Sequence, residues 1–372
     1  MTLPTPPSTS FNVGRNSPSS AAPATRYDAG SLREFANGLL RNSGVASDIA
    51  TDVAEILVDG DLMEHTTHGL ALLPAYLDQL ERGAMAKEGA PREIHATSAA
   101  QTWDGQRLPG PWLTLRALDT ALGMAREHGT GTVVVRRSHH IGCLAAYLKR
   151  ATDRGAMALV YCSDPSNHSV APFGAVTSVF TPNPLAAGIP TSADPILLDV
   201  SASYTTNGLT TRLYQSGESL AHPWLQDAEG NPTRDPAVLF NEPKGTLLPL
   251  GGLEAGHKGF ALALLVEAMT AGLAGHGRAD PSEGWGATVF VQVLDPGHFG
   301  GLAAFERQMD WIVGACHRAT PRPGGSAVRL PGERALARYR DQTAHGVALY
   351  PTIMPALETW AQKLGVALPR TL

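Results

Sequence analysis

The sequence holds two groups of histidines that are suited to proton transfer. Residues 64–69 read Glu-His-Thr-Thr-His-Gly, and His139 and His140 stand side by side after an apolar run. An imidazole titrates near neutral pH, so a histidine held by a carboxylate can give a proton to a carbonyl oxygen or take one from a carbinol. Asp199 ends a second apolar run and is suited to fix the tautomer of one imidazole. These residue types predict general acid–base chemistry.

Motifs of several other chemistries are missing from the sequence. It has no G-x-G-x-x-G dinucleotide turn and no G-x-S-x-G nucleophile elbow. His65-x-x-His68 and the adjacent His139-His140 are possible metal ligands in principle, but there is no H-E-x-x-H, and no Cys or carboxylate stands at a recognisable ligand spacing, so no metal site is expected. Residues 251–259 look like a P-loop, but Gly259 follows Lys258 where a P-loop has Ser or Thr, which argues against an NTPase. The segment is either an anion-binding helix start or a glycine-rich helix entry.

Helices and strands alternate in the segments that must position these residues. Apolar residues at helical spacing predict helices on both sides of residues 64–69, with Thr66 or Thr67 as the N-cap of the second. The alternation predicts an α/β fold with polar groups at the carboxyl ends of strands. The expected helices are residues 32–40, 45–62, 69–80, 112–128 (ended by Gly129), 144–154, 260–275, 302–318 and 331–342. The expected strands are residues 132–135, 156–161, 196–200 and 287–294, with a hairpin turn at Asp104-Gly105 and a rigid turn at residues 181–184 before residues 185–189.

From its composition we expect a globular, cytoplasmic protein. The 372 residues are 43% hydrophobic and 17% charged, which allows a large buried core. A net charge of −5 and the lack of a basic run argue against nucleic acid as a partner. Three well-separated cysteines indicate a reducing compartment. Residues 1–25 are rich in Pro, Ser, Thr and Asn and predict a disordered tail, and no stretch is apolar enough to predict a membrane helix.

Several stretches in a fixed order resemble one family, the malate/L-lactate dehydrogenase family of NAD(P)-dependent oxidoreductases. This family includes sulfolactate and ureidoglycolate dehydrogenases and cyclic imino-acid reductases. Each stretch is unspecific alone, but the ordered set is specific and covers roughly residues 28–345. The stretches are residues 61–76, 135–142, 181–190, 196–201, 256–264 and 330–333.

The resemblance implies an α/β fold of the sulfolactate-dehydrogenase-like type. This NAD(P)-binding fold is not a Rossmann fold, in agreement with the missing fingerprint, and it has a helical part built from both termini. Residues 26–115 together with 310–372 are expected to form the helical and α/β domain, and residues 116–309 the NAD(P)-binding and substrate region. The resemblance further implies NAD or NADP as cofactor, a small-molecule substrate and a homodimer.

By the same resemblance, individual site residues can be assigned. His68 matches a proton donor, Thr67 stands where relatives have a relay Ser, and Asp199 matches the relay Asp. His140 matches the acid/base residue of ureidoglycolate-type members; it competes with His68 for that role and is slightly favoured, because a histidine near the nicotinamide needs no relay. The expected cofactor contacts are His140, Ile141, Gly142, Leu198, Asp199, Val200, Ser201, His257, Lys258, Gly259, Pro331 and Glu333. The expected substrate contacts are Tyr76, Arg137, Ser138 and Asn183.

One departure from the family pattern concerns the substrate. Many members carry an Arg, which can grip a carboxylate through two hydrogen bonds, at the position of Leu72. The remaining candidates for a carboxylate anchor are Arg136, Arg137 and Arg212. The sequence thus predicts hydride transfer between nicotinamide and a C–OH/C=O or C=N group, with a substrate that is bulkier or less charged than malate or lactate. The alternative is a related scaffold that binds a small molecule without turnover.

Overall fold

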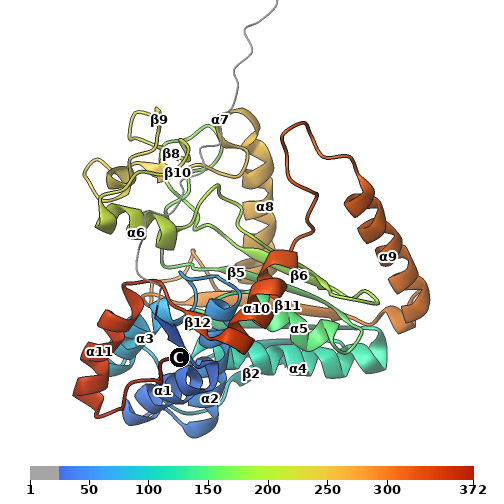
Figure 1. The fold of residues 1–372 in the computed structure, drawn as a ribbon, viewed down its shortest axis with the longest axis horizontal. Coiled ribbons are helices and arrows are strands. Elements are labelled where there is room, and N and C mark those ends of the chain that lie inside the picture. Colours follow the sequence, from blue (N-terminus) through green and yellow to red (C-terminus); the bar gives the residue numbers. More distant parts are fainter. Residues whose placement is uncertain (1–24) are drawn as a thin grey trace, which may run out of the picture.

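A seven-stranded sheet forms the centre of the protein, of which this computed structural model describes residues 25–372 (Figure 1). The strand order is β2-β3-β4-β11-β5-β6-β7, and only β3 and β4 are parallel neighbours. Because β11 and β6 run antiparallel to their neighbours, β3, β4, β5 and β7 all point the same way. The strands are β2 (Arg92–Ala96), β3 (Ala100–Asp104), β4 (Thr130–Ser138), β5 (Met157–Ser163), β6 (Leu185–Ile189), β7 (Ile196–Val200) and β11 (Ala287–Leu294).

Because these strands share one direction, the segment with His139 and His140 and the segment with Asp199 lie at one edge of the sheet. The chain leaves β4 just before His139 and leaves β7 just after Asp199, so both segments start at the same edge of the sheet. Polar residues at the carboxyl ends of strands are the usual place for a site in an α/β protein. The expectation of an α/β fold with such an edge is confirmed.

Helices α4 (Gly110–His128) and α5 (Ala145–Thr152) pack on the sheet, and α2 (Ser47–Leu62) packs against both. The approach of α4 to β4 is close: a Cβ on Gly131 would lie 2.1 Å from the carbonyl oxygen of Ala121. Only glycine fits such a contact. Gly129 ends α4 in the left-handed conformation with φ 81°, as the sequence predicts.

Both ends of the chain build the helical part, where the blue and red segments of Figure 1 lie together. The two-residue strand β1 pairs with β12, and Leu357 of the last helix and Leu32 of the first are both completely buried. The expected helical part from both termini is confirmed. Its elements are β1 (Arg26–Tyr27), α1 (Ala29–Asn42), η1 (Leu70–Leu72), α3 (Leu73–Glu81), α10 (Glu333–His345), β12 (Val347–Ala348) and α11 (Ile353–Leu364).

A smaller lobe lies on the other side of the sheet edge, at the upper left of Figure 1. It has its own core around Leu220, Leu225 and Leu247. Its elements are α6 (Asn207–Ser216), β8 (Leu225–Gln226), β9 (Pro232–Thr233), η2 (Pro236–Leu239), β10 (Thr246–Leu247), α7 (Gly252–Ala255), α8 (His257–Glu267) and the π-helical turn η3 (Ala268–Gly272). The chain then passes through β11 and η4 (Pro296–His298) to α9 (Leu302–Arg318).

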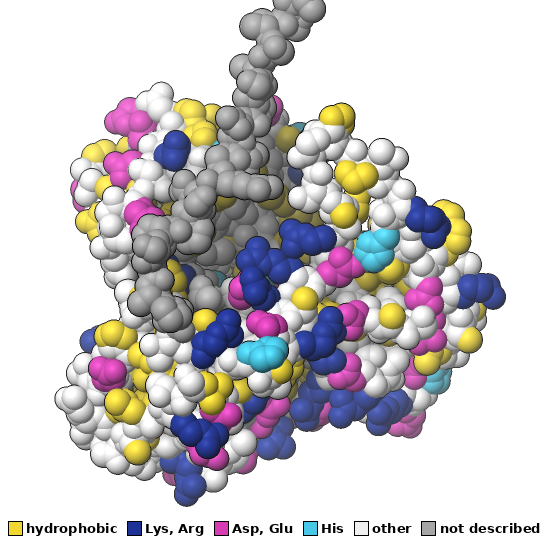
Figure 2. Space-filling model, viewed as in Figure 1, with side chains coloured by type: hydrophobic (Ala, Val, Ile, Leu, Met, Phe, Trp, Pro, Cys, Tyr) yellow, Lys and Arg dark blue, Asp and Glu magenta, His cyan; other side chains and the backbone are white. Residues whose placement is uncertain are grey.

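Positive and negative side chains are intermixed on the face shown in Figure 2. On α10, Arg334 and Arg338 form ion pairs of 2.7 and 2.9 Å with Glu64. These pairs connect α10 to the segment that contains His65 and His68. No helix in residues 25–372 is both long and apolar enough to cross a membrane.

Two local expectations are wrong. Asp104 is the last residue of β3, which pairs in parallel with β4, so the hairpin turn lies instead at residues 97–99, between β2 and β3. Neither threonine caps the helix after residues 64–69, because η1 begins after Gly69 without a side-chain cap. The expected tail falls almost wholly on residues 1–24, outside the described residues. The division into domains at residues 115 and 310 stays a prediction, and the central sheet takes strands from both sides of residue 115.

Candidate active site

The loop of residues 63–69 is fixed by a buried carboxylate. Asp61, in the last turn of α2, accepts a 2.7 Å hydrogen bond from the backbone N–H of Leu70. The carboxylate lies directly on Gly69, where a Cβ would come within 2.4 Å of Oδ2. The N–H of His65 also donates to the carbonyl of Gly60, at 2.9 Å. Asp61 therefore does the work that the sequence assigned to a threonine cap, and it holds both histidines of the loop in place.

His68 is half-buried and lies near a carboxylate charge. Its Nδ1 lies 2.8 Å from Oγ1 of Thr67, so the expected pairing of these two residues is present. Burial lowers the pKa of His68 below its usual value, while the negative charge of Asp199 opposes that shift. The charge of Arg212 adds to the lowering of this pKa. Of the two histidines expected in catalysis, His68 is the one with a carboxylate near enough to support its charged form.

His140 is held as a neutral imidazole. The N–H of Gly142 donates to its Nδ1 at 3.2 Å, so the ring proton sits on Nε2. The hydroxyl of Tyr76 lies 3.0 Å from the same Nδ1 and 3.0 Å from the carbonyl oxygen of His140. Burial holds the pKa of His140 well below its usual value, and the charges of His68 and His139 act in the same direction.

The acid–base centre, formed by His68 and His140, lies among other aromatic rings. The His68 and His140 rings stack with centroids 5.9 Å apart, and His140 also packs at 5.0 Å against Trp285. Tyr76 lies edge-on to His140 at 6.1 Å. Trp285 stands just before β11 and had no signal in the sequence. His139 contacts the other side of Trp285 at 4.9 Å, and burial lowers its pKa to about 3, so it is a neutral packing residue.

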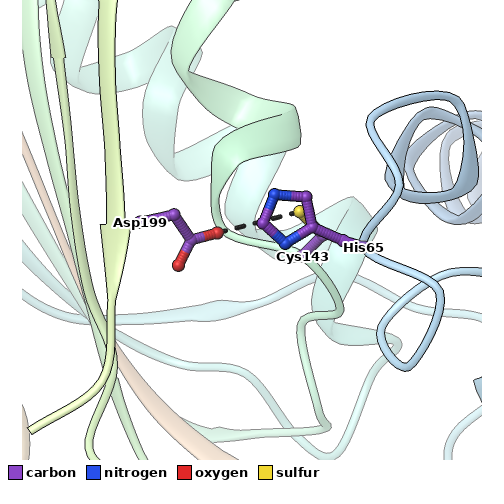
Figure 3. Close-up of side chains that lie close together, drawn as sticks. All are labelled: His65, Cys143 and Asp199. Carbon is purple, nitrogen blue, oxygen red and sulfur yellow. Dashed lines mark hydrogen bonds between the residues drawn. The ribbon is translucent and has the colours of Figure 1, made fainter. Parts of the chain in front are cut away.

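Asp199 is bonded differently from the sequence-based expectation. Its Oδ2 accepts the N–H of Ala145 at 2.9 Å and lies 3.8 Å from the thiol of Cys143. Within residues 25–372 it hydrogen-bonds neither His68 nor His140, so it does not fix the tautomer of either ring. The imidazole beside it is that of His65 (Figure 3).

The segments expected to contact the cofactor meet around β7. Leu197 donates its N–H to the carbonyl of Pro331 at 3.2 Å. Beyond the strand, Leu250 donates to Ala202 at 2.8 Å and accepts from Gly259 at 3.0 Å. The N–H of Ala145, at the start of α5, also binds Asp199. Together these contacts bring the four segments that carry the twelve expected cofactor residues close to one another. The glycines of residues 251–259 serve close packing, since a Cβ on Gly259 would lie 2.3 Å from the Leu250 nitrogen.

Three of the four expected substrate contacts are engaged in other bonds. Arg137 pairs with Asp104 and Glu283. The hydroxyl of Ser138 donates to the backbone oxygen of His139. Asn183 is completely buried and bonds Thr181, Ala263 and Glu267. Only Tyr76 contacts the acid–base centre.

The three arginines considered as carboxylate anchors also differ in position. Arg136 lies 3.4 Å from the carboxylate of Asp104, which it shares with Arg137. Arg212 instead reaches from α6 to the loop of residues 63–69, donating to Oγ1 and to the carbonyl oxygen of Thr66 at 2.9 and 2.6 Å. Its guanidinium lies 3.8 Å from the ring centroid of Tyr350. Arg212 is thus the arginine beside His68.

Comparison with known proteins identifies the fold and the class of enzyme. A family model described as malate/L-lactate dehydrogenase matches residues 27–358. The chain belongs to this family. It is therefore an oxidoreductase that uses NAD or NADP.

The chain aligns with nearly the whole length of several named relatives. An L-lactate dehydrogenase of Cupriavidus necator is 32% identical over 346 residues, 91% of this chain and 98% of that protein. A (2R)-3-sulfolactate dehydrogenase (NADP(+)) of Chromohalobacter salexigens is 31% identical over 84% of this chain and 92% of that protein. The crystal structure of malate dehydrogenase from Entamoeba histolytica superimposes with a TM-score of 0.87 at 25% identity, covering 93% of this chain and all of that one.

The chemistry at the junction around β7 fits a nicotinamide dinucleotide. Lys258 and His257 are exposed in the first turn of α8, where the positive charge of the lysine suits a phosphate. Val200, at the end of β7, leaves 43% of its surface exposed and offers an apolar contact for a ring. The segments that meet here thus provide both kinds of contact that the cofactor requires.

Proposed function

We propose that the protein moves hydride between NAD(P) and the C–OH/C=O group of a 2-hydroxy or 2-oxo acid, or the C=N group of a related imine, with His68 exchanging the proton. The observation that carries this proposal is the stacked pair of His68 and His140, of which only His68 lies near a carboxylate charge. Relatives named for lactate, malate and sulfolactate support a hydroxy acid as substrate.

His140 acts as a neutral hydrogen-bond donor in this proposal. The N–H of Gly142 occupies its Nδ1, which leaves Nε2–H as the group that can donate to a substrate oxygen. A neutral imidazole whose pKa is far below 7 polarises a carbonyl without giving up its proton. Tyr76 and Trp285 fix the ring from two sides. The slight preference of the sequence-based prediction for His140 as acid/base is therefore reversed.

His68 exchanges the proton. In oxidation the neutral ring takes a proton from the carbinol, and in reduction the charged ring returns it. Thr67 holds Nδ1 of His68 at 2.8 Å, and the charge of Asp199 stabilises the protonated ring. The cofactor, held by residues around β7 and the start of α8, supplies the hydride chemistry, and the protein supplies orientation and the proton path.

Arg212 is the proposed anchor for a substrate carboxylate. Two of its five N–H groups bind Thr66, which leaves others for a ligand, and its charge lies close enough to His68 to lower the pKa of that ring. Leu72, in η1, offers no charge. A single arginine and an apolar neighbour suit a monocarboxylate with an apolar or bulky side chain better than malate.

We also propose a homodimer in the cytoplasm. No residue of α9 is buried, and Trp311 and Ile312 leave 64% and 43% of their surface exposed. On α8, Leu264 and Leu265 are about half exposed, at 49% and 46%. Such apolar faces suit contact with a second copy of the chain. Light scattering should give a molar mass of twice the 39.2 kDa of one chain. The mass of a monomer at micromolar protein concentration would contradict the dimer. Free thiols at all three cysteines agree with a reducing compartment.

The test begins with cofactor binding. NADH or NADPH fluorescence should change on titration with the purified protein, and one or more members of a panel of 2-oxo acids, 2-oxo amides and cyclic imines should be reduced. If neither cofactor binds, the proposed function is wrong. If a cofactor binds but no member of the panel is reduced, the alternative of a binding scaffold without turnover gains support.

A further inference from the structure

A histidine, a cysteine and an aspartate converge beside the acid–base centre. His65 comes from the loop after α2, Cys143 precedes α5, and Asp199 lies on β7 (Figure 3). Each offers one ligand atom, and these atoms all lie within 4.8 Å of one another. The Cys143 sulfur is 3.8 Å from Oδ2 of Asp199. No local spacing in the sequence marks this group, because its members come from three distant segments.

We propose that His65, Cys143 and Asp199 bind a divalent metal ion of the zinc type, and that this ion competes with the nicotinamide cofactor. The second half of this statement rests on the proposed function, which assigns residues 140–142 and 198–201 to the cofactor. An ion on Cys143 and Asp199 occupies the same strand end and loop. The metal would then act as an inhibitor and not as a part of the reaction.

The donor set matches the preferences of zinc. Zinc binds imidazole nitrogen and carboxylate oxygen at about 2.0–2.2 Å and thiolate sulfur at about 2.3 Å. Tetrahedral ligand atoms are then about 3.3–3.8 Å apart, so atoms that now lie within 4.8 Å of one another have to approach by about 1.5 Å at most. His65 is half-buried and belongs to a loop, and its side chain can supply this movement. Three protein ligands leave a fourth position open for water.

Charge balance and surrounding bonds also favour the ion. A thiolate and a carboxylate together carry two negative charges, which a divalent ion neutralises. Without an ion, burial and the charge of Asp199 raise the pKa of the Cys143 thiol, so the metal must displace a proton. The N–H of Ala145 orients the Asp199 carboxylate at 2.9 Å, and a hydrogen bond of this kind holds a carboxylate ligand in the orientation that a metal requires. The backbone N–H of His65 binds the carbonyl oxygen of Gly60 at 2.9 Å and fixes the position of the loop that carries the imidazole.

The first experiment titrates Co²⁺ into reduced, metal-free, full-length protein and records the absorption spectrum. One equivalent should give a thiolate-to-cobalt charge-transfer band and the strong visible bands of tetrahedral cobalt, and Zn²⁺ should abolish both. Cys143→Ser should remove the charge-transfer band, and His65→Gln should weaken binding by at least about tenfold. Cys316→Ser, which removes a thiol of α9 outside the site, is the control and should leave the spectrum unchanged. A missing band, or a band that survives Cys143→Ser, would overturn the site.

The second experiment measures NADH and NADPH binding by fluorescence with and without Zn²⁺. Saturating Zn²⁺ should weaken cofactor binding by at least about tenfold in the unaltered protein and by much less in His65→Gln. If the cobalt band forms but cofactor affinity does not change, the competition is refuted. If the band forms and neither cofactor binds, the proposed function fails while the metal site stands. If a cofactor binds but no cobalt band forms, the metal site is refuted while the proposed function stands.

Discussion

The hydroxyl of Tyr76 lies 3.0 Å from Nδ1 of His140. The same nitrogen accepts a hydrogen bond from the N–H of Gly142. The Gly142 N–H donates to this nitrogen, and the Tyr76 hydroxyl donates to the carbonyl oxygen of His140, so the only proton of the neutral ring lies on Nε2, away from both. This arrangement suits a hydrogen-bond donor and not a group that loses and regains a proton. It separates the role of His140 from that of His68.

Tyr76→Phe removes the hydroxyl and leaves the ring in its pocket. Loss of one hydrogen bond of about 1 kcal/mol should lower kcat by roughly fivefold, with cofactor affinity unchanged. Stopped-flow measurement of cofactor oxidation gives both quantities. Tyr161→Phe, on β5 and packed against Phe290, is the matched control and should have no effect. Equal rates in the two variants would mean that the tyrosine does not orient the imidazole.

Arg212→Lys keeps the charge but loses the paired bonds to Thr66. The KM for the carboxylate substrate should rise by at least about tenfold, because the anchor and the loop both shift, while the Kd for NAD(P)H should stay within about twofold. Arg334→Lys is the control, because this exposed arginine of α10 binds Glu64 of the same loop. Exposed ion pairs contribute little, so its KM should not change. An unchanged KM in Arg212→Lys would rule out the anchor.

Asp61 predicts a dependence of stability on pH. Burial raises its pKa to about 7, above the value of about 4 in an unfolded chain. A group with a raised pKa stabilises the fold fully below its unfolded pKa and loses that contribution as pH rises through the folded one. The free energy of unfolding should therefore fall by roughly 2–3 kcal/mol from about pH 5 to about pH 7 through this residue. Denaturant unfolding of Asp61→Asn should lack this part of the decline; an identical decline would exclude Asp61 as its source.

Gly69→Ala should damage the site through packing alone. The added Cβ would lie 2.4 Å from Oδ2 of Asp61, so the loop has to move, at a cost of roughly 1–3 kcal/mol. Thermal unfolding and turnover should both decline. Gly123→Ala is the control: that glycine is exposed in α4 with no atom within 4 Å of the added group, and alanine there should stabilise by about 0.5–1 kcal/mol. Two glycine substitutions of equal effect would contradict the packing argument.

The sequence predicts elements well where one local signal decides them. The bounds of β7, β11 and α9 agree with the structure, because apolar runs and helical spacing are both short-range patterns. The hairpin at Asp104 was wrong, since an Asp-Gly pair also suits the chain as it leaves a strand that pairs in parallel with β4. Its carboxylate binds arginines from β4 instead of forming a turn.

The site was less accessible to sequence-based reasoning, because its contacts join distant segments. The resemblance to a family identified His68 and His140, but the position of the His140 ring depends on Tyr76, 64 residues away. Trp285 had no motif, and Asp61 begins the first family-like stretch but had no role assigned to it; the roles of both appear only once the loop and the strands are folded together. Arg137 and Asn183 carry groups that suit a ligand, yet ion pairs and buried hydrogen bonds with partners far along the chain engage them.

The pH dependence of kcat/KM in the direction of substrate reduction tests the central claim most directly. With whichever 2-oxo acid or imine of the panel is reduced, the rate should fall as pH rises through a single pKa, that of His68, because reduction needs the protonated ring. His68→Gln should lower the rate by at least about a hundredfold and remove this decline, whereas His140→Gln should be slower than the unaltered enzyme and keep the decline. A decline that persists in His68→Gln and disappears in His140→Gln would assign the proton to His140 and contradict the account.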